Sequence, residues 1–395
     1  MSNLKQVVLI DAVRTPIGAF GGALAEIPAP KLGSHVIKAL LARTRIAAEQ
    51  IDEVIMGCVL PANTGQAPAR QAALGAGLPD SVQCMTINKV CGSGLKAIML
   101  AAQAIQVGDA EVIIAGGMEN MSQAPYYVHG LRTGLKMGHG ATVDSLLRDG
   151  LWDPYSDSHM GDLAELCAAE YHISREDQDD FAIMSYTRAQ EAQKNGLFKQ
   201  EIVPVEIPQK KGEPFLFDTD EEPAKVNFEK MKTLRPVFKK EGTITAANAS
   251  SINDGAAAVL LMSAEKAAQL GLQPLATIVA QASAAKAPAW FTTAPADAIN
   301  KVLAKAKLTT QDIDVYEINE AFAVVSLVNH QLLGLPVDKV NINGGAVALG
   351  HPIGASGARI LTTLLHVMQQ KKAKRGLASL CIGGGEATAL IVEAL

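Results

Sequence analysis

The chain has 395 residues, of which 48% are hydrophobic, 19% are charged and 4% are aromatic, and 34 are glycine. This length and composition are those of a globular protein of two or three domains, and they exclude a disordered or fibrous chain. The 35 basic side chains are outnumbered by 40 acidic ones, for a net charge of −5. Because binding to nucleic-acid phosphates needs a surplus of basic residues, we expect no nucleic-acid partner.

The cysteines indicate a reducing compartment. There are five, scattered and without a Cys-x-x-Cys motif: Cys58, Cys84, Cys91, Cys167 and Cys381. An odd number without close spacing argues against a disulfide framework and against a zinc site. The apolar run 7–10 is too short for a signal peptide, and we expect no stretch to reach the ~18 apolar residues of a membrane span. We therefore expect a cytoplasmic protein with no bound metal and no membrane partner.

The first third of the chain alternates predicted strands with predicted helices. Cys91-Gly92-Ser93-Gly94 opens an apolar stretch over 95–107, which predicts a buried helix that Gly108 ends. Gly116-Gly117 is predicted to end the strand that follows. This alternation is typical of an α/β fold with a mostly parallel sheet covered by helices on both faces. Three short apolar runs are the predicted buried strands of this part: 7–10, 51–57 and 112–115.

The same order of elements recurs near the end of the chain. The run 313–318 resembles 51–56, and Gly354-Ala355-Ser356-Gly357 precedes an apolar helix as 91–94 does. A third match joins 378–384 to the strand before Gly116-Gly117. Three matches in one order at nearly one offset predict a duplicated α/β unit, although chance similarity between glycine-rich elements would give the same pattern.

Residues 122–245, between the two similar parts, have a different composition. They contain seven prolines and most of the aromatic residues. Ser174-Arg175-Glu176-Asp177 is typical of a helix start, with a cap residue and acids in the first turn, and predicts a helix through about Gly196. Residues 209–240 carry eight basic and six acidic side chains. This segment is either a lobe that contacts phosphate or, more commonly, a solvated loop region.

Two residues could form a nucleophile and its base. Cys91 lies where a glycine-rich turn becomes a helix, and the unpaired N–H groups and partial positive charge of a helix start favour a thiolate. His351 lies in Gly350-His351-Pro352-Ile353-Gly354, a loop before a predicted helix, and histidine can accept a thiol proton. The ordinary alternatives are an inert buried cysteine and a structural loop histidine.

Two further positions are candidates for the same site. Cys381 ends a predicted strand before Gly383-Gly384-Gly385, whose amides could converge as an oxyanion hole or, alternatively, form a phosphate-binding turn. Asn319-Glu320-Ala321-Phe322-Ala323 also follows a strand, and Asn319 could simply cap a helix. By the duplication, Cys91, His351, Asn319 and Cys381 lie at the same edge of their sheets, where α/β folds place ligands. Two thiols, an imidazole and glycine amides suit acyl transfer with carbon–carbon chemistry.

The chain resembles the thiolase family over almost its whole length, from about Val7 to the C-terminus. Asn319-Glu320-Ala321-Phe322 and Gly350-His351-Pro352-Ile353-Gly354 are similar to two of the family's four signature blocks. The other two blocks, and two further segments that resemble the family, are Asn88-Lys89-Val90-Cys91-Gly92-Ser93-Gly94, Cys381-Ile382-Gly383-Gly384-Gly385, Val13-Arg14-Thr15-Pro16 and Ala247-Asn248-Ala249-Ser250-Ser251-Ile252-Asn253-Asp254-Gly255-Ala256.

The resemblance implies the thiolase fold, a duplicated five-layered αβαβα core with an inserted loop domain. The N-terminal half would comprise 1–121 and 252–271, the inserted CoA-binding loop domain 122–251, and the C-terminal half 272–395. Family members are dimers or tetramers, and we expect a homotetramer built as a dimer of dimers.

The resemblance also implies a function, acetyl-CoA C-acetyltransferase, by reversible ping-pong Claisen chemistry. His351 would take the proton of Cys91, which would then carry the acetyl group. Cys381 would remove a proton from the methyl carbon of a second acetyl-CoA. The enolate would be stabilised by His351 and by a water held by Asn319. The oxyanion on acetyl-Cys91 would meet the amides of Cys91 and Gly383, with His351 counted among the oxyanion-hole residues.

The substrates implied are acetyl-CoA, acetoacetyl-CoA and CoA, with no permanently bound cofactor. In the insert, His159-Met160-Gly161 is similar to the short-chain enzymes, in which the methionine narrows the acyl pocket. Pro223 and Lys225 stand where relatives often have an aromatic residue and an arginine near the adenosine of CoA, and this departure puts potassium activation in doubt. The remaining positions that match substrate-contacting residues of relatives are Leu151, Phe238, Ala246, Ser250, Phe291 and Phe322.

Four other functions compete with this expectation. The nearest is a 3-ketoacyl-CoA thiolase for longer chains in fatty-acid β-oxidation. A ketoacyl synthase is disfavoured because a decarboxylating enzyme needs no cysteine such as Cys381 to remove a carbon-bound proton. A silent CoA-binding protein on the same fold would lack a reactive Cys91. A dinucleotide-dependent oxidoreductase is weaker, because no clean Gly-x-Gly-x-x-Gly follows a strand.

Overall fold

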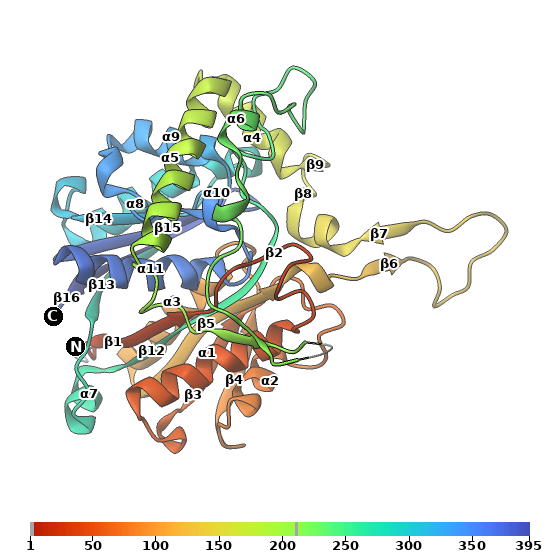
Figure 1. The fold of residues 1–395 in the computed structure, drawn as a ribbon. Helices are drawn as coiled ribbons and strands as arrows, with labels where there is room; N and C mark the ends of the chain where they lie inside the picture. The colour runs from red at the N-terminus through yellow and green to blue at the C-terminus, as the bar shows by residue number, and fades with distance from the viewer. Residues whose placement is uncertain (1–3, 210–211) are drawn as a thin grey trace.

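The computed structural model describes residues 4–209 and 212–395. Within these residues the largest sheet has ten strands, in the order β14-β15-β16-β13-β1-β12-β5-β3-β4, with β2 paired to β12 (Figure 1). Its strands are β1 (Val7–Arg14), β2 (Gly18–Ala19), β3 (Glu53–Gly57), β4 (Gln83–Ile87), β5 (Val112–Asn120), β12 (Asn253–Ser263), β13 (Ala276–Ala285), β14 (Val315–Ile318), β15 (Arg375–Ile382) and β16 (Glu386–Ala394).

Helices pack on and between these strands. They are α1 (Ala29–Thr44), α2 (Pro68–Gly75), α3 (Ser93–Val107), α7 (Ala264–Leu270), α8 (Ala294–Ala306), α9 (Ala323–Leu333), α10 (Ala346–Leu349) and α11 (Ser356–Lys371). Short 3₁₀ turns occur at Ala48–Gln50, Met121–Gln123, Pro223–Lys225, Pro288–Thr293, Thr310–Asp312 and Val337–Lys339, and a π-helical turn at Leu146–Leu151.

The expected repetition of one α/β unit is present. Strands β3 and β5 are parallel neighbours with α3 between them in the chain, and β14 and β15 are parallel neighbours that precede and follow α11. The mostly parallel sheet expected from the sequence is wrong, since antiparallel pairs outnumber parallel ones in the described sheet. The reason is visible at β15 and β16, which a tight turn over 383–385 connects, and a turn that short can join only antiparallel strands.

Five layers result from the way the two units face each other. Helices α3 and α11 lie in the middle and share one hydrophobic core with strands of both units (Figure 1). Helices α1 and α2 cover the outer face of one unit, and α8 covers the outer face of the other. The middle helices cross at glycines: a Cβ on Gly357 would lie 2.3 Å from the backbone nitrogen of Leu95. Most residues of α3 are buried in this core, which explains why the helix is largely apolar.

That composition also corrects an expectation about membrane spans. The segment Val90–Val107 is long and apolar enough to cross a membrane by length and composition alone, whereas we expected no such stretch from the sequence. More than half of this segment is buried inside the protein, as in the core helix of many globular folds.

Strand β5 continues to Asn120, so the prediction that Gly116-Gly117 ends it is wrong. These glycines serve close packing instead. A Cβ on Gly116 would lie 2.1 Å from the Ala257 carbonyl oxygen, and one on Gly117 would lie 2.0 Å from the Gly354 carbonyl oxygen. Glycine inside a strand therefore marks a close backbone approach here rather than a turn.

The insert forms small sheets and helices over the rest of the molecule. Ser174 and Asp177 form a capping box at the start of α5, as predicted. The elements of the insert are β6 (Tyr126–Val128), β7 (Thr142–Asp144), β8 (Trp152–Asp153), β9 (Ser158–His159), α4 (Met160–Glu170), α5 (Arg175–Lys194), β10 (Val205–Ile207), β11 (Phe215–Phe217) and α6 (Phe228–Met231). Lys210 and Lys211 of the predicted basic segment lie outside the described residues.

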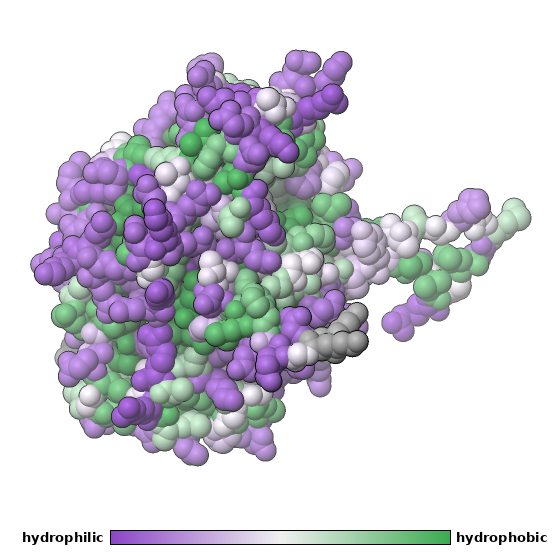
Figure 2. Space-filling model, in the orientation of Figure 1, coloured by the Kyte–Doolittle hydropathy of each residue, from purple (hydrophilic) through white to green (hydrophobic). Residues whose placement is uncertain are grey.

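The β6–β7 hairpin projects from the body as a long arm (Figure 1). Figure 2 shows apolar side chains along this arm. The strongly exposed apolar residues of the arm are Tyr126, Leu131, Leu135 and Met137.

Candidate active site

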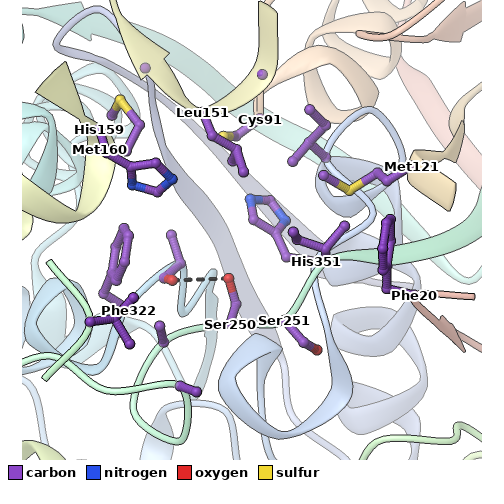
Figure 3. A pocket seen from close by; sticks show the side chains of 18 of the residues that line it. Phe20, Cys91, Met121, Leu151, His159, Met160, Ser250, Ser251, Phe322 and His351 are labelled. Carbon is purple, nitrogen blue, oxygen red and sulfur yellow. Dashed lines mark hydrogen bonds between the residues drawn. The ribbon is translucent and has the colours of Figure 1, made fainter. Parts of the chain in front are cut away.

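A cavity of about 500 Å³ lies where the two units meet the insert (Figure 3). The four chemically capable segments of the sequence converge here, although they are separated by up to 290 positions between Cys91 and Cys381. Predicted site residues on its wall are Cys91, Leu151, His159, Met160, Lys225, Phe238, Ala246, Ser250, Phe291, Phe322, His351, Cys381 and Gly383. Asn319 lies behind the wall, in contact with His351.

Cys91 lies in the turn that leads into α3. The turn is held by Ser93, whose Oγ accepts a hydrogen bond from the Lys89 N–H (2.8 Å) and donates to the Val90 carbonyl (2.7 Å). Val90 adopts a left-handed conformation (φ 47°), which is strained for a β-branched residue and marks a backbone under constraint. Strain of this kind is found where a side chain must be aimed, and Cys91 follows directly.

The Cys91 thiol is protonated at rest. Burial raises its pKa to about 11, and hydrogen bonds from the N–H groups of Gly383 and of Cys91 itself only partly oppose this rise. The expected stabilisation of a thiolate by the helix start is therefore outweighed by desolvation. The same two N–H groups form a small donor pair at the sulfur, which is the arrangement of an oxyanion hole.

His351 carries its proton on Nδ1. Its Nδ1 lies 2.5 Å from Ser356 Oγ, and that hydroxyl donates its only hydrogen to the Pro352 carbonyl oxygen (2.9 Å). Ser356 can therefore only accept from the ring, which leaves Nε2 with a free lone pair. Burial lowers the pKa of His351 to about 3, with a smaller contribution from the charge of Arg359, so the ring is neutral at pH 7.

The backbone of His351 is fixed as firmly as its ring. The His351 N–H donates to Asn253 Oδ1 (2.9 Å), and Asn253 Nδ2 donates to the Gly18 carbonyl oxygen (3.0 Å). Gly350 has φ 101°, and a Cβ there would lie 2.3 Å from Asn253 Oδ1, so only glycine allows this approach. The turn therefore presents Nε2 to the cavity in one orientation.

Asn319 does not cap a helix, which removes the ordinary interpretation of this residue. Helix α9 begins at Ala323 with Phe322 at its cap position. Asn319 follows β14, is fully buried, and directs Nδ2 toward His351 Nε2 at 3.5 Å. Its Oδ1 has no hydrogen-bond partner among the described residues. The amide is thus placed to hold a small polar group beside the imidazole.

Cys381 lies near the end of β15, buried beside the cavity. Its pKa is raised well above the ordinary thiol value, first by burial and then by the charge of a Cys91 thiolate. The two sulfur atoms are therefore close enough to repel each other as anions. Gly384 and Gly385 have φ of 88° and 83°, which lets the chain reverse directly after the cysteine.

Aromatic rings close one side of the cavity. The His159 ring stacks on Phe238 (centroids 4.7 Å apart), and Phe322 packs edge-on against both Phe238 and Phe291. A Cβ on Gly161 would lie 2.2 Å from the Phe238 ring, so this glycine is what permits the stack. Met160 lines the same wall (Figure 3).

Lys225 lies at the mouth of the cavity, largely exposed. Its Nζ is 3.8 Å from Glu222 Oε1, a loose pair that leaves the ammonium available to an anion. Ser250 donates its hydroxyl to the Ala321 carbonyl oxygen (2.9 Å) and so fixes two segments of the wall (Figure 3).

Several lining residues belong to no motif in the sequence. Those with the clearest place at the cavity are Phe20, Met121, Leu147, Val237 and Thr245. Single residues in loops and short turns have no distinguishing pattern, so only the three-dimensional arrangement identifies them. In residues 4–209 and 212–395 no group of three or more His, Cys, Asp or Glu side chains has an arrangement that could hold a metal ion.

Two family profiles and several known proteins are similar to this chain over most of its length. The family profile "Thiolase, N-terminal domain" matches residues 7–265, and "Thiolase, C-terminal domain" matches residues 272–394. A protein of Cupriavidus necator named acetyl-CoA acetyltransferase is 57% identical over 391 residues, 99% of this chain and 100% of that protein. One of the same name from Pseudomonas aeruginosa is 56% identical over 388 residues, 98% of this chain and 99% of its own. The crystal structure of the Bacillus anthracis acetyl-CoA acetyltransferase superposes with a TM-score of 0.97 at 43% identity, covering all of both chains.

Proposed function

This chain belongs to the thiolase family and is an acyltransferase, and on this premise we propose that it is an acetyl-CoA C-acetyltransferase. The reaction is the reversible condensation of two acetyl-CoA molecules to acetoacetyl-CoA and CoA. The observation that carries the proposal is the convergence of two thiols and one neutral imidazole on a single cavity. The names of the relatives from Cupriavidus necator and Pseudomonas aeruginosa support the same activity.

The first half-reaction transfers an acetyl group to Cys91. His351 Nε2 takes the thiol proton, and the thiolate attacks the thioester carbon of acetyl-CoA. The oxyanion that forms is stabilised by the N–H groups of Cys91 and Gly383. When the carbon–sulfur bond to CoA breaks, the imidazolium returns the proton to the leaving CoA thiolate. Acetyl-Cys91 remains.

The second half-reaction forms the carbon–carbon bond. Acetylation removes the negative charge that Cys91 would carry, and with it one of the causes that raise the Cys381 pKa. His351 Nε2 then takes the thiol proton of Cys381, and the Cys381 thiolate takes a proton from the methyl carbon of a second acetyl-CoA. His351 and a water held by Asn319 stabilise the enolate oxygen, and the enolate carbon attacks acetyl-Cys91. The Cys91 thiolate leaves and takes the proton back from the His351 imidazolium, and acetoacetyl-CoA is released.

The wall of the cavity favours a short acyl chain. Met160 and the packed rings of Phe238, Phe291 and Phe322 border the space next to the two thiols. Apolar walls exclude longer chains by volume, because a packed core does not yield space without a free-energy cost. A 3-ketoacyl-CoA thiolase for longer chains would need this wall to open.

We propose the remaining features on the same family basis. The halves are 1–121 with 252–271 and 272–395, and the insert 122–251 binds CoA, since it supplies most of the cavity wall. The exposed Lys225 ammonium is available for a phosphate of CoA. The protein works as a homotetramer in the cytoplasm without a permanently bound cofactor, and the apolar β6–β7 arm suits contact with another copy. Potassium activation stays doubtful, because Pro223 replaces the aromatic residue.

The test is CoA-dependent cleavage of acetoacetyl-CoA, monitored as the loss of the absorbance of its thioester enolate. The same assay is run with a long-chain 3-ketoacyl-CoA for comparison. We expect cleavage of acetoacetyl-CoA with the higher kcat/KM. A clear preference for the long chain would defeat the short-chain proposal, and no turnover of either substrate would defeat the assignment to acyl transfer.

A further inference from the structure

A buried carboxylate lies beneath the site without lining the cavity. Glu119, near the end of β5, is fully buried, and no cation pairs with it in the part of the chain that the structure describes. Its partners are neutral donors. Oε2 accepts from the N–H groups of Val59 (2.9 Å) and Gly354 (2.8 Å), and Oε1 accepts from Leu60 N–H (3.1 Å) and weakly from the Cys58 thiol (3.6 Å). A buried carboxyl group without a counter-ion is costly and calls for a reason.

The donors come from both halves of the molecule. Val59 and Leu60 follow β3 in the N-terminal unit, whereas Gly354 closes the turn that carries His351 in the other unit. The contact between Glu119 and Gly354 spans 235 positions of the chain. Glu119 is therefore a side-chain bridge from the unit that holds Cys91 to the turn that holds His351.

Glycines allow the close backbone approach at the position where this bridge forms. A Cβ on Gly57 would lie 2.8 Å from the Gly354 carbonyl oxygen, and one on Gly117 would lie 2.0 Å from it. A Cβ on Gly57 would also lie 2.6 Å from the Cβ of Ser93, the first residue of α3. The Gly354 peptide thus docks on the ends of β3 and β5 and on the start of the Cys91 helix. The carboxylate of Glu119 accepts a hydrogen bond from the Gly354 N–H group.

The charge of Glu119 does not help the chemistry directly. A negative charge at Glu119 raises the pKa of Cys91, which opposes formation of the nucleophile. Burial raises the pKa of Glu119 itself to about 7, against the effect of its three backbone hydrogen bonds. What the group offers is geometry, because one rigid carboxyl group fixes two loops at once.

We infer that Glu119 is a positioning residue that sets His351 Nε2 against the Cys91 sulfur by holding the Gly354 N–H. The inference rests on the proposed function, since it assigns Glu119 to the proton transfer between those two groups. Glu119 touches neither the substrate nor the reacting atoms. Misplacement of a catalytic group by about an ångström is enough to cost ~10²-fold in rate.

The experiment compares Glu119→Gln and Glu119→Asp with Asp52→Asn in the full-length protein. Gln has the same shape but turns an N–H₂ group toward the backbone donors, and Asp keeps the charge but falls short of Gly354. Asp52, which is exposed, is the control for loss of a carboxylate that holds backbone N–H groups away from the site, because its Oδ2 accepts from the N–H groups of Glu111 (2.7 Å) and Val112 (2.9 Å) at the opposite end of β5.

We expect kcat for acetoacetyl-CoA cleavage to fall about 10- to 100-fold in both Glu119 variants, with KM changed less than about threefold. Alkylation of Cys91 by iodoacetamide, which follows the thiolate fraction, should become faster in Glu119→Gln, because loss of the negative charge lowers the Cys91 pKa, and should stay close to the wild-type rate in Glu119→Asp. Asp52→Asn should match the wild type in both measurements.

Three results would overturn the inference. The first is a folded Glu119→Gln with kcat within about twofold of the wild type, and the second is a kcat that falls in Glu119→Gln but not in Glu119→Asp, which would make the charge and not the position of the carboxylate responsible. The third is failure of both Glu119 variants to fold while Asp52→Asn folds, which would make Glu119 a folding residue. A wild type without turnover would instead refute the proposed function, which distinguishes that failure from a failure of this inference.

Discussion

Ser356 determines which nitrogen of His351 is the base. Its hydroxyl lies 2.5 Å from His351 Nδ1 and gives its hydrogen to Pro352, so the ring proton stays on Nδ1 and Nε2 faces the cavity unprotonated. Ser356 is five residues after the histidine, on the first turn of α11. One hydroxyl therefore connects the start of a core helix to the tautomer of the candidate base.

Ser356→Ala should lower kcat for acetoacetyl-CoA cleavage about tenfold with little change in KM, because the ring would populate both tautomers and more than one orientation. Steady-state kinetics on the variant measures this directly. Ser356→Thr keeps a hydroxyl at the same place and should recover part of the loss. Equal loss in both variants would mean that packing, and not the hydroxyl, matters at this position.

The raised pKa of Cys91 predicts how its reactivity depends on pH. Because the pKa is about 11 and that of His351 is about 3, the resting pair is a neutral thiol and a neutral imidazole. The rate of iodoacetamide alkylation at Cys91 should therefore rise steadily between pH 6 and pH 9, approaching tenfold per pH unit, as the thiolate fraction grows. A plateau already reached near pH 7 would indicate a preformed thiolate–imidazolium pair and would contradict the assignment.

Met160→Ala should widen the acyl end of the cavity. Removal of the methionine side chain leaves the rings of Phe238 and Phe322 in place but vacates the space beside them. We compare kcat/KM for a five- or six-carbon 3-ketoacyl-CoA with kcat/KM for acetoacetyl-CoA. We expect the ratio of the first to the second to rise about tenfold, because one or two methylene groups in an apolar pocket change kcat/KM by about this factor. An unchanged ratio would show that another residue sets the chain length.

The sequence is informative about this site where local backbone chemistry carries the signal. Glycine and proline around His351 predict a fixed loop, and glycine after Cys91 and Cys381 predicts turns at the ends of elements. These features depend on a few neighbouring residues, and the structure has each turn where it was expected. The family resemblance added the roles of the side chains, which no local pattern contains.

What the sequence could not predict depends on partners far along the chain. Desolvation of Cys91 by residues of both halves raises its pKa and keeps it a thiol at rest. The start of its helix acts in the opposite direction, because it favours the thiolate. The local sequence predicts that Gly116-Gly117 ends the strand. β5 nevertheless continues through these glycines, because the Gly354 turn packs against them. Glu119 has no motif of its own, since its main partner lies 235 positions away.

The central claim is a division of labour in which Cys91 carries the acetyl group and Cys381 acts on carbon. Mass spectrometry of the wild type, Cys91→Ser and Cys381→Ala after exposure to acetyl-CoA tests it most directly, together with an assay for acetoacetyl-CoA. The account predicts an acetyl group on Cys91 in the wild type and in Cys381→Ala, none in Cys91→Ser, and no acetoacetyl-CoA from Cys381→Ala. An acetyl adduct on Cys91→Ser, or its absence from a folded Cys381→Ala, would contradict the account.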